Sequence, residues 1–344
     1  MKEAQSHPDL PRISRSLLTP GAQPPLSQFG LTLLRHVVAT SLRYSLYQLG
    51  LPLPESPPVR LLGLRLFLDA KPLEELLTGT DGGSEILAAL VDPGGVSAGA
   101  LPPRLRATAA FHRIRLRLGL RRARRSLSWR PDDSCERHWA AFEECLRAQQ
   151  RSLGDAMLAE ILAVLQRREA RSRGVRPGGA LGSAAWKALQ GSTSSFSSLG
   201  PLDPLRPSWA EDSDHYRGLI AGLHAEALED PLPRPGLRGS FRETYRYFLS
   251  EVSSALRSFG DSAVGDDVMS DGEDLFFVPF QLCGELTGDR RPAWFDAAVA
   301  TNRAERAGLL ESPEHPDEMR GSPALADQID RTADWDLAPL SILP

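Results

Sequence analysis

Apolar residues recur along most of the chain at every third or fourth position, which is the spacing of amphipathic helices. The first such stretch runs from Leu31 to Leu46; Ser27 is placed to cap it, and Gly50 and Pro52 are placed to end it. The same spacing predicts further helices over residues 104–127, 133–168, 212–228, 241–259 and 292–307. We therefore expect a mainly α-helical fold.

Two stretches depart from the helical spacing. Residues 59–68, bracketed by Pro58 and Pro72, alternate in part between apolar and polar positions and contain Gly63. This pattern predicts a short β-ribbon that turns near the glycine. Residues 275–280 form an apolar run interrupted by a proline, and we expect a short, buried, extended segment there.

Composition along the chain predicts one main domain with two less regular ends. We expect residues 1–13 to be flexible, residues 14–310 to form a central helical domain and residues 311–344 to form an acidic tail. Within the domain, residues 172–204 are rich in glycine and serine. That composition predicts a loop or a mobile lid.

Overall composition excludes several classes of protein. Hydrophobic content of 41% and charged content of 24% are ordinary for a globular chain. A formal net charge of −4 gives no general case for binding nucleic acid. The three cysteines form no CxxC pair and fit a reducing compartment. No stretch reaches the ~18 apolar residues of a membrane span, and no signal peptide is visible. We expect a cytoplasmic protein without a membrane span.

Charge is nevertheless distributed unevenly along the chain. Residues 101–130 contain ten arginines and no acidic residue, whereas residues 261–344 contain 18 acidic residues and six arginines. Such an arginine run can bind an anionic surface. We interpret it instead as a solvated helix face that pairs with the acidic C-terminal third.

Familiar catalytic motifs are missing from the sequence. It contains no P-loop, no dinucleotide-binding glycine motif, no HExxH, no GxSxG and no cysteine–histidine cluster with zinc spacing. Cys135 and His138 share one face of a predicted helix, but a pair of this kind is usually explained by packing. Any function must therefore rest on less specific signals.

Six short stretches together carry a family resemblance. In chain order they are Pro25 to Arg35, Val59 to Asp69, Leu205 to Asp212, Arg242 to Tyr247, Gly272 to Val278 and Asn302 to Arg306. Their order resembles the central domain of the phosphoenolpyruvate-utilising group, which includes the phosphoenolpyruvate synthase-like proteins and the rifampicin phosphotransferases. The resemblance covers roughly residues 14–321. Ser270-Asp271-Gly272 replaces the family's proline before Glu273, and Gly63-Leu64 replaces its Gly-Gly.

The resemblance implies a helical, acceptor-binding domain that stands alone. Full members of the group look like an ATP-grasp domain, this central domain and a swivelling phospho-His domain. The chain would then hold a sizeable, largely apolar small-molecule acceptor. It would need no cofactor of its own, and separate ATP-grasp and phospho-His proteins would be its partners.

A candidate catalytic group lies on the predicted helix 241–259. Arg242 and Arg246 are four residues apart, so they share one helix face and can grip a phosphoryl group. Glu243 can orient one of these arginines or act as a base. In the related family the matching basic pair faces the phosphotransfer centre. The alternative is an ordinary solvated helix face.

A different hypothesis rests on a short acidic run. Asp266, Asp267 and Asp271 have the DDxxxD spacing that can hold Mg²⁺ against a diphosphate. The chain would then be a Mg-dependent, terpene cyclase-like enzyme that acts on a prenyl diphosphate in a repurposed helical pocket. Gly265 and Gly272 flank the run, which indicates a loop rather than a helix wall. A scaffold without chemistry is a third possibility.

Overall fold

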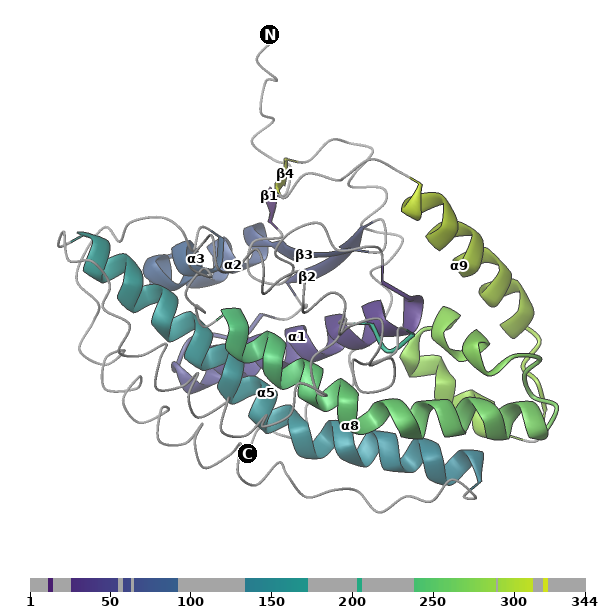
Figure 1. Ribbon diagram of the computed structural model, residues 1–344. Helices are drawn as coiled ribbons and strands as arrows, with labels where there is room; N and C mark the ends of the chain where they lie inside the picture. The colour runs from purple at the N-terminus through teal and green to yellow at the C-terminus, as the bar shows by residue number, and fades with distance from the viewer. Residues whose placement is uncertain are drawn as a thin grey trace, which may run out of the picture.

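The computed structural model describes residues 12–14, 26–54, 58–62, 65–91, 134–172, 203–205, 238–288, 290–311 and 318–320. Over these ranges the protein is mainly α-helical, as predicted (Figure 1). The helices predicted over 104–127 and 212–228 lie outside the described residues, as do nearly all of the predicted lid, most of the acidic tail and most of the predicted N-terminal segment.

The described part consists of six α-helices, two 3-10 helices and four short strands. The α-helices are α1 (Gln28–Gln48), α2 (Ala70–Leu77), α3 (Gly83–Val91), α5 (Cys135–Ser172), α8 (Arg238–Gly265) and α9 (Phe295–Leu310). The 3-10 helices are η2 (Gly272–Phe277) and η3 (Phe280–Thr287), and the strands are β1 (Arg12–Ser14), β2 (Val59–Leu62), β3 (Arg65–Asp69) and β4 (Glu318–Arg320).

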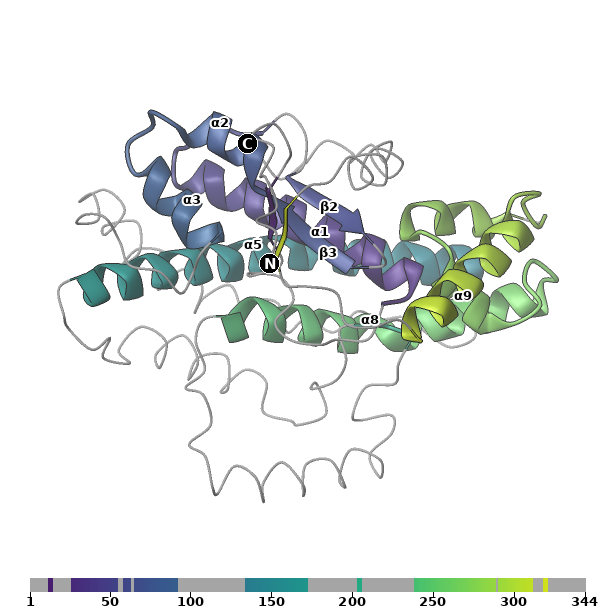
Figure 2. The same cartoon turned by 90° about the horizontal axis from the view of Figure 1, so that it is seen from above.

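Helix α1 forms the centre of the molecule. Ser27 caps it as predicted, because its hydroxyl accepts a hydrogen bond from the Gly30 N–H at 3.1 Å. Gly50, with φ +66°, ends the helical turn at the other end, as predicted. Almost every residue between is buried, which is the property of a helix surrounded by other elements. It contacts α5, β2, β3, η2 and η3, while α2–α3 and α9 lie toward its opposite ends (Figure 2).

Helix α5 packs side by side with α8 and also packs against α1, and these three helices form the largest part of the core (Figure 1). Phe142 of α5 lies where the three helices meet. Its ring centroid is 5.8 Å from that of Phe29 in α1, 4.9 Å from that of Trp139 and 6.4 Å from that of Phe248 in α8. This aromatic cluster joins three segments that are far apart in the sequence.

A glycine allows α1 and α5 to approach closely. A Cβ atom at Gly154 would lie only 2.5 Å from the ring of Tyr44. The Tyr44 hydroxyl donates a hydrogen bond of 2.8 Å to the carboxylate of Asp155 beside it. A glycine at this position of α5 therefore costs helix propensity but allows the tyrosine to pack against the helix backbone.

The predicted β-ribbon is present. β2 and β3 are antiparallel, with Val59 opposite Leu68 and Leu62 opposite Arg65. β1 pairs with β3 and β4 pairs with β1, so the strand order is β2-β3-β1-β4. Asp69 ends the ribbon and caps α2 by accepting a hydrogen bond from the Lys71 N–H at 3.2 Å.

The prediction of an extended segment over residues 275–280 is wrong for most of its length. Leu275 to Phe277 belong to η2 and Phe280 begins η3, so only Val278 and Pro279 are extended. The Asp271 carboxylate caps η2 by accepting a hydrogen bond from the Glu273 N–H at 2.9 Å. An apolar run predicts burial, which is observed, but it does not distinguish a strand from a buried helical turn.

Within the described ranges, no helix combines the length and the apolar character that crossing a bilayer requires.

Candidate functional site

The helix that carries the predicted catalytic group is present and is longer than predicted. Arg242 and Arg246 lie one turn apart on α8 and therefore on one face of it. Arg246 is half-buried. The side chains of Arg242 and Glu243 lie outside the part that the structure describes, so their predicted roles stay predictions.

The neighbouring face of α8 is aromatic and buried. It consists of Phe241, Tyr245 and Phe248, which we call the aromatic face of α8. The rings of Phe241 and Tyr245 are nearly parallel, with centroids 6.5 Å apart, and the centroid of Phe248 is 6.0 Å from that of Tyr245. Because 3.6 residues make one turn, the face of Arg242 and Arg246 is rotated from this one by about 100°.

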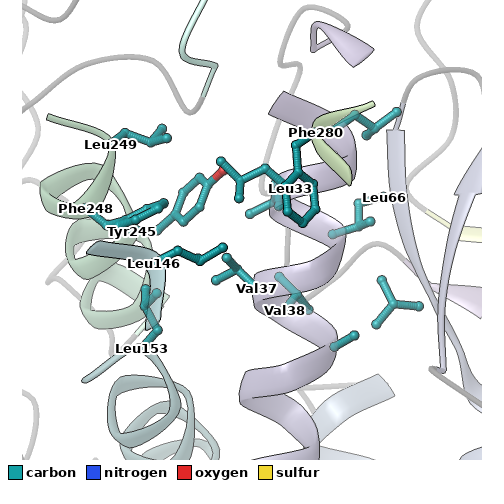
Figure 3. Packing of buried hydrophobic residues seen from close by; sticks show 14 of the residues in the cluster. Leu33, Val37, Val38, Leu66, Leu146, Leu153, Tyr245, Phe248, Leu249 and Phe280 are labelled. Carbon is teal, nitrogen blue, oxygen red and sulfur yellow. The ribbon is translucent and has the colours of Figure 1, made fainter. Parts of the chain in front are cut away.

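Tyr245 projects from this face toward α1. Figure 3 shows its hydroxyl directed toward the side of Leu33 and Phe280. The side chain is fully buried, and its hydroxyl has no hydrogen-bond partner among the described residues. An unpaired buried hydroxyl is unusual, because nearly all buried polar groups in proteins are paired.

A buried carboxylate ties the first turn of α1 to a distant part of the chain. One oxygen of Asp203 accepts hydrogen bonds from the Ser27 hydroxyl at 2.5 Å and from the Leu205 N–H at 3.2 Å, and the other accepts from the Ser27 N–H at 2.7 Å. Arg306 of α9 approaches the second oxygen at 4.0 Å. A Cβ atom at Gly30 would lie 2.8 Å from the same carboxylate, so this junction requires the glycine.

Burial dominates the electrostatics of this junction. It raises the pKa of Asp203 above its usual range, although the hydrogen bonds from Ser27 and Leu205 and the charge of Arg306 act in the opposite direction. Burial also raises the pKa of Tyr245 well above its usual range, and the negative charge of Asp203 adds to this effect. Tyr245 is therefore a neutral phenol at physiological pH, able to donate a hydrogen bond.

The three aspartates of the alternative hypothesis lie in an exposed connection, as their flanking glycines predict. Asp266 and Asp267 form the turn after α8, with Asp267 at φ +59°. Asp271 pairs with Arg303 at 3.2 Å, and Arg303 also pairs with Asp274 at 2.8 Å. In the part of the chain that the structure describes, no three carboxylate, imidazole or thiol groups gather closely enough to hold a metal ion.

The cysteines are structural in character. Cys135, Cys145 and Cys283 are free and buried. Burial raises the pKa of Cys135 to about 11 and that of Cys145 to about 12, so both remain protonated thiols. Cys135 and His138 both face the interior from α5, which supports packing as the explanation of this pair.

His36 is a half-buried polar residue that the sequence did not single out. It lies on α1, with its ring centroid 5.3 Å from that of Phe280 and its Nε2 3.2 Å from the amide nitrogen of Gln150. This contact fits a neutral imidazole that accepts a hydrogen bond from the amide. Burial lowers the pKa of His36 to about 4.

The lowered pKa of His36 predicts an acid-sensitive fold. The unfolded chain binds a proton at this residue near pH 6.5 and the folded chain does so only near pH 4. The stabilisation from the neutral ring is complete above pH 6.5 and is lost as the pH falls toward 4, at a cost of about 2–3 kcal/mol. Urea unfolding of the natural protein and of His36→Gln at pH 7.0 and 4.5 should show this loss in the natural protein only.

Comparing the two proteins cancels the effect of the other groups that titrate in this pH range. Burial raises the pKa of Asp203 and of Asp274, so these groups change stability with pH in the opposite direction. They are present in both proteins, and only the difference between the two proteins reports His36. Equal losses of stability in the two proteins would show that His36 does not titrate abnormally.

Sequence reasoning predicted that Arg242 and Arg246 share one face of this helix, but it missed Tyr245 and Asp203. Tyr245 lies inside one of the stretches that resemble the family, and its spacing from Phe241 and Phe248 indicates a buried face. Asp203-Pro204 indicates only a turn, and nothing local marks its pairing with Ser27, 176 residues away.

Comparison of the chain with models of known protein families and with curated proteins gives no match, so the resemblance to the phosphoenolpyruvate-utilising group rests on the sequence motifs alone.

Proposed function

We propose that this chain binds a sizeable, largely apolar small molecule and presents it for phosphoryl transfer. It would be the acceptor-binding subunit, or a stand-alone relative, of a phosphoenolpyruvate synthase-like or rifampicin phosphotransferase-like enzyme. One observation supports this most: α8 forms, and the face that carries Arg242 and Arg246 lies directly beside the aromatic face of Phe241, Tyr245 and Phe248.

The two faces suit the two ends of such a ligand. Aromatic rings favour an apolar body, and guanidinium groups one turn apart favour a phosphoryl group. A separate phospho-His protein, charged by a separate ATP-grasp protein, would supply the phosphoryl group. The N–P bond of the phospho-His would break, an O–P bond to the acceptor hydroxyl would form, and Glu243 would take the hydroxyl proton.

The cyclase hypothesis has less support. It needs Asp271 as a ligand of Mg²⁺, but this carboxylate already accepts a hydrogen bond from the Glu273 N–H and pairs with Arg303. Asp266 and Asp267 are exposed in a turn rather than directed from a helix wall. The phosphotransferase proposal is therefore preferred.

Replacing either arginine of the pair should weaken binding of a phosphorylated aromatic probe. With 2-naphthyl phosphate as the probe, Arg242→Ala or Arg246→Ala should each cost about 1.5–3 kcal/mol, because one charge-assisted hydrogen bond is lost. This corresponds to a dissociation constant roughly 10- to 150-fold higher. Titrations followed by ligand-observed NMR would measure it.

Two controls make the experiment specific. Arg257 is a second half-buried arginine of α8, and it lies 11 residues, or about 16 Å, beyond Arg246 along the helix axis. Arg257→Ala should leave binding of 2-naphthyl phosphate unchanged. Binding of 2-naphthol, which lacks the phosphoryl group, should be unaffected in Arg242→Ala and Arg246→Ala. Equal losses in all three variants would contradict the proposed role of the pair.

A further inference from the structure

Two buried tyrosines of the described chain differ in one respect. The hydroxyl of Tyr44 donates to Asp155 at 2.8 Å, whereas the hydroxyl of Tyr245 has no partner among the described residues. Both side chains are buried, and Tyr245 is among the largest fully buried side chains. A phenylalanine at position 245 would fill nearly the same volume without burying a polar atom, so packing alone does not explain the tyrosine.

The surroundings of this hydroxyl define what could pair with it. The ring lies between Phe241 and Phe248, and the hydroxyl is directed toward α1 on the side of Leu33 and Phe280 (Figure 3). Such surroundings favour an apolar ligand body. The hydroxyl keeps its proton, so it acts as a donor and its partner must be an acceptor.

The charge nearby selects among acceptors. The negative charge of Asp203 acts on the Tyr245 hydroxyl and disfavours a second negative charge there. An anionic oxygen of a phosphoryl group or a carboxylate would also have to leave water for the apolar surroundings of Leu33 and Phe280, so it is a poor partner at this position. An uncharged oxygen can accept the hydrogen bond without this repulsion.

We propose that Tyr245 donates a hydrogen bond to an uncharged oxygen, such as a ketone or ether oxygen, of an apolar ligand that binds between α8 and α1. The inference rests on the proposed function, because this ligand would be the acceptor molecule. It adds a second polar contact to that molecule: the phosphoryl-accepting end lies at Arg242 and Arg246, and a neutral oxygen lies at Tyr245.

The first test measures the thermal stability of the protein without a ligand. Tyr245→Phe removes a polar atom that has no partner, so the Tm should rise by about 2–4 °C. Tyr44→Phe is the matched control, because it removes a hydroxyl that is paired, and its Tm should fall. A fall of the Tm in Tyr245→Phe would show that the hydroxyl is already paired within the free protein and would overturn the proposal.

The second test measures binding with two pairs of isosteric probes. Each pair replaces a carbonyl oxygen by a methylene group: acetophenone with α-methylstyrene, and 2-acetylnaphthalene with 2-isopropenylnaphthalene. The natural protein should bind at least one ketone about 10-fold more tightly than its hydrocarbon twin, and Tyr245→Phe should bind the two equally. Ketone binding that does not exceed hydrocarbon binding, or that Tyr245→Phe leaves unchanged, would overturn the proposal, as would a failure of both ketones to bind.

Failure of this inference is distinguishable from failure of the proposed function. Arg246→Ala should leave the preference for the ketone intact, because the ketone carries no phosphoryl group. Conversely, in the Tyr245→Phe background, replacing Arg246 with alanine should still weaken binding of 2-naphthyl phosphate. If the natural protein shows no preference for the ketone but its binding of 2-naphthyl phosphate depends on Arg246, only the role of Tyr245 is overturned. If the preference for the ketone depends on Tyr245 but binding of 2-naphthyl phosphate does not depend on Arg246, only the role of the arginine pair is overturned.

Discussion

Replacing Phe142 with alanine should lower the free energy of unfolding by about 3–5 kcal/mol. The ring lies where α1, α5 and α8 meet and contacts Phe29, Trp139 and Phe248. Truncation removes buried apolar surface and leaves a cavity that three helices cannot close without moving together. Urea unfolding followed by far-UV circular dichroism would measure the change in midpoint.

Two further variants make this result interpretable. Phe142→Leu keeps most of the apolar volume and should cost less than the alanine variant. Leu310 of α9 has half of its surface exposed, so Leu310→Ala should change the free energy of unfolding by no more than about 0.5 kcal/mol. If Phe142→Ala cost no more than Leu310→Ala, the three helices would not share the core described above.

The alanine variant of Asp203 should be comparably destabilised, by about 3–5 kcal/mol. It leaves the N–H and hydroxyl of Ser27 and the N–H of Leu205 without their acceptor and leaves Arg306 without its counter-charge. Asp203→Asn should recover only part of the loss, because both carboxylate oxygens accept hydrogen bonds and an amide offers only one acceptor. Thermal and urea unfolding would rank the three proteins.

An exposed acidic residue provides the control for this prediction. Glu305 lies on the outer side of α9, next to Arg306 in the sequence, and Glu305→Ala should shift stability by no more than about 0.5 kcal/mol. If Asp203→Asn were as stable as the natural protein, the carboxylate would not be needed at the junction.

Local sequence signals predicted the elements that depend on neighbouring residues. The Ser27 cap, the Gly50 stop and the β-ribbon over residues 59–68 were predicted because capping, chain reversal and strand alternation involve only a few adjacent residues. The run over 275–280 was predicted as buried but not as 3-10 helix, since apolar content reports burial rather than backbone conformation.

The candidate site was predicted less completely, for a physical reason. The spacing of Arg242 and Arg246 is local, and the helix that it requires is observed. The lack of a partner for Tyr245 and the pairing of Ser27 with Asp203 depend on contacts between distant segments. A single sequence contains no local record of such contacts, so neither feature could be derived from periodicity or motif.

The pairing of Ser27 with Asp203 also affects the order in which the protein can be completed during synthesis. The acceptor for the first turn of α1 is made 176 residues after Ser27, and Phe280, whose N–H donates to Thr32, is made 248 residues after Thr32. At about 5–20 residues per second, Asp203 is translated roughly 9–35 s after Ser27. Throughout that time some of the segments that cover α1 have not been synthesised, although α1 is buried on nearly every side in the finished protein. The nascent chain therefore exposes apolar surface of α1 that the finished protein buries, and we expect chaperones to bind there during synthesis.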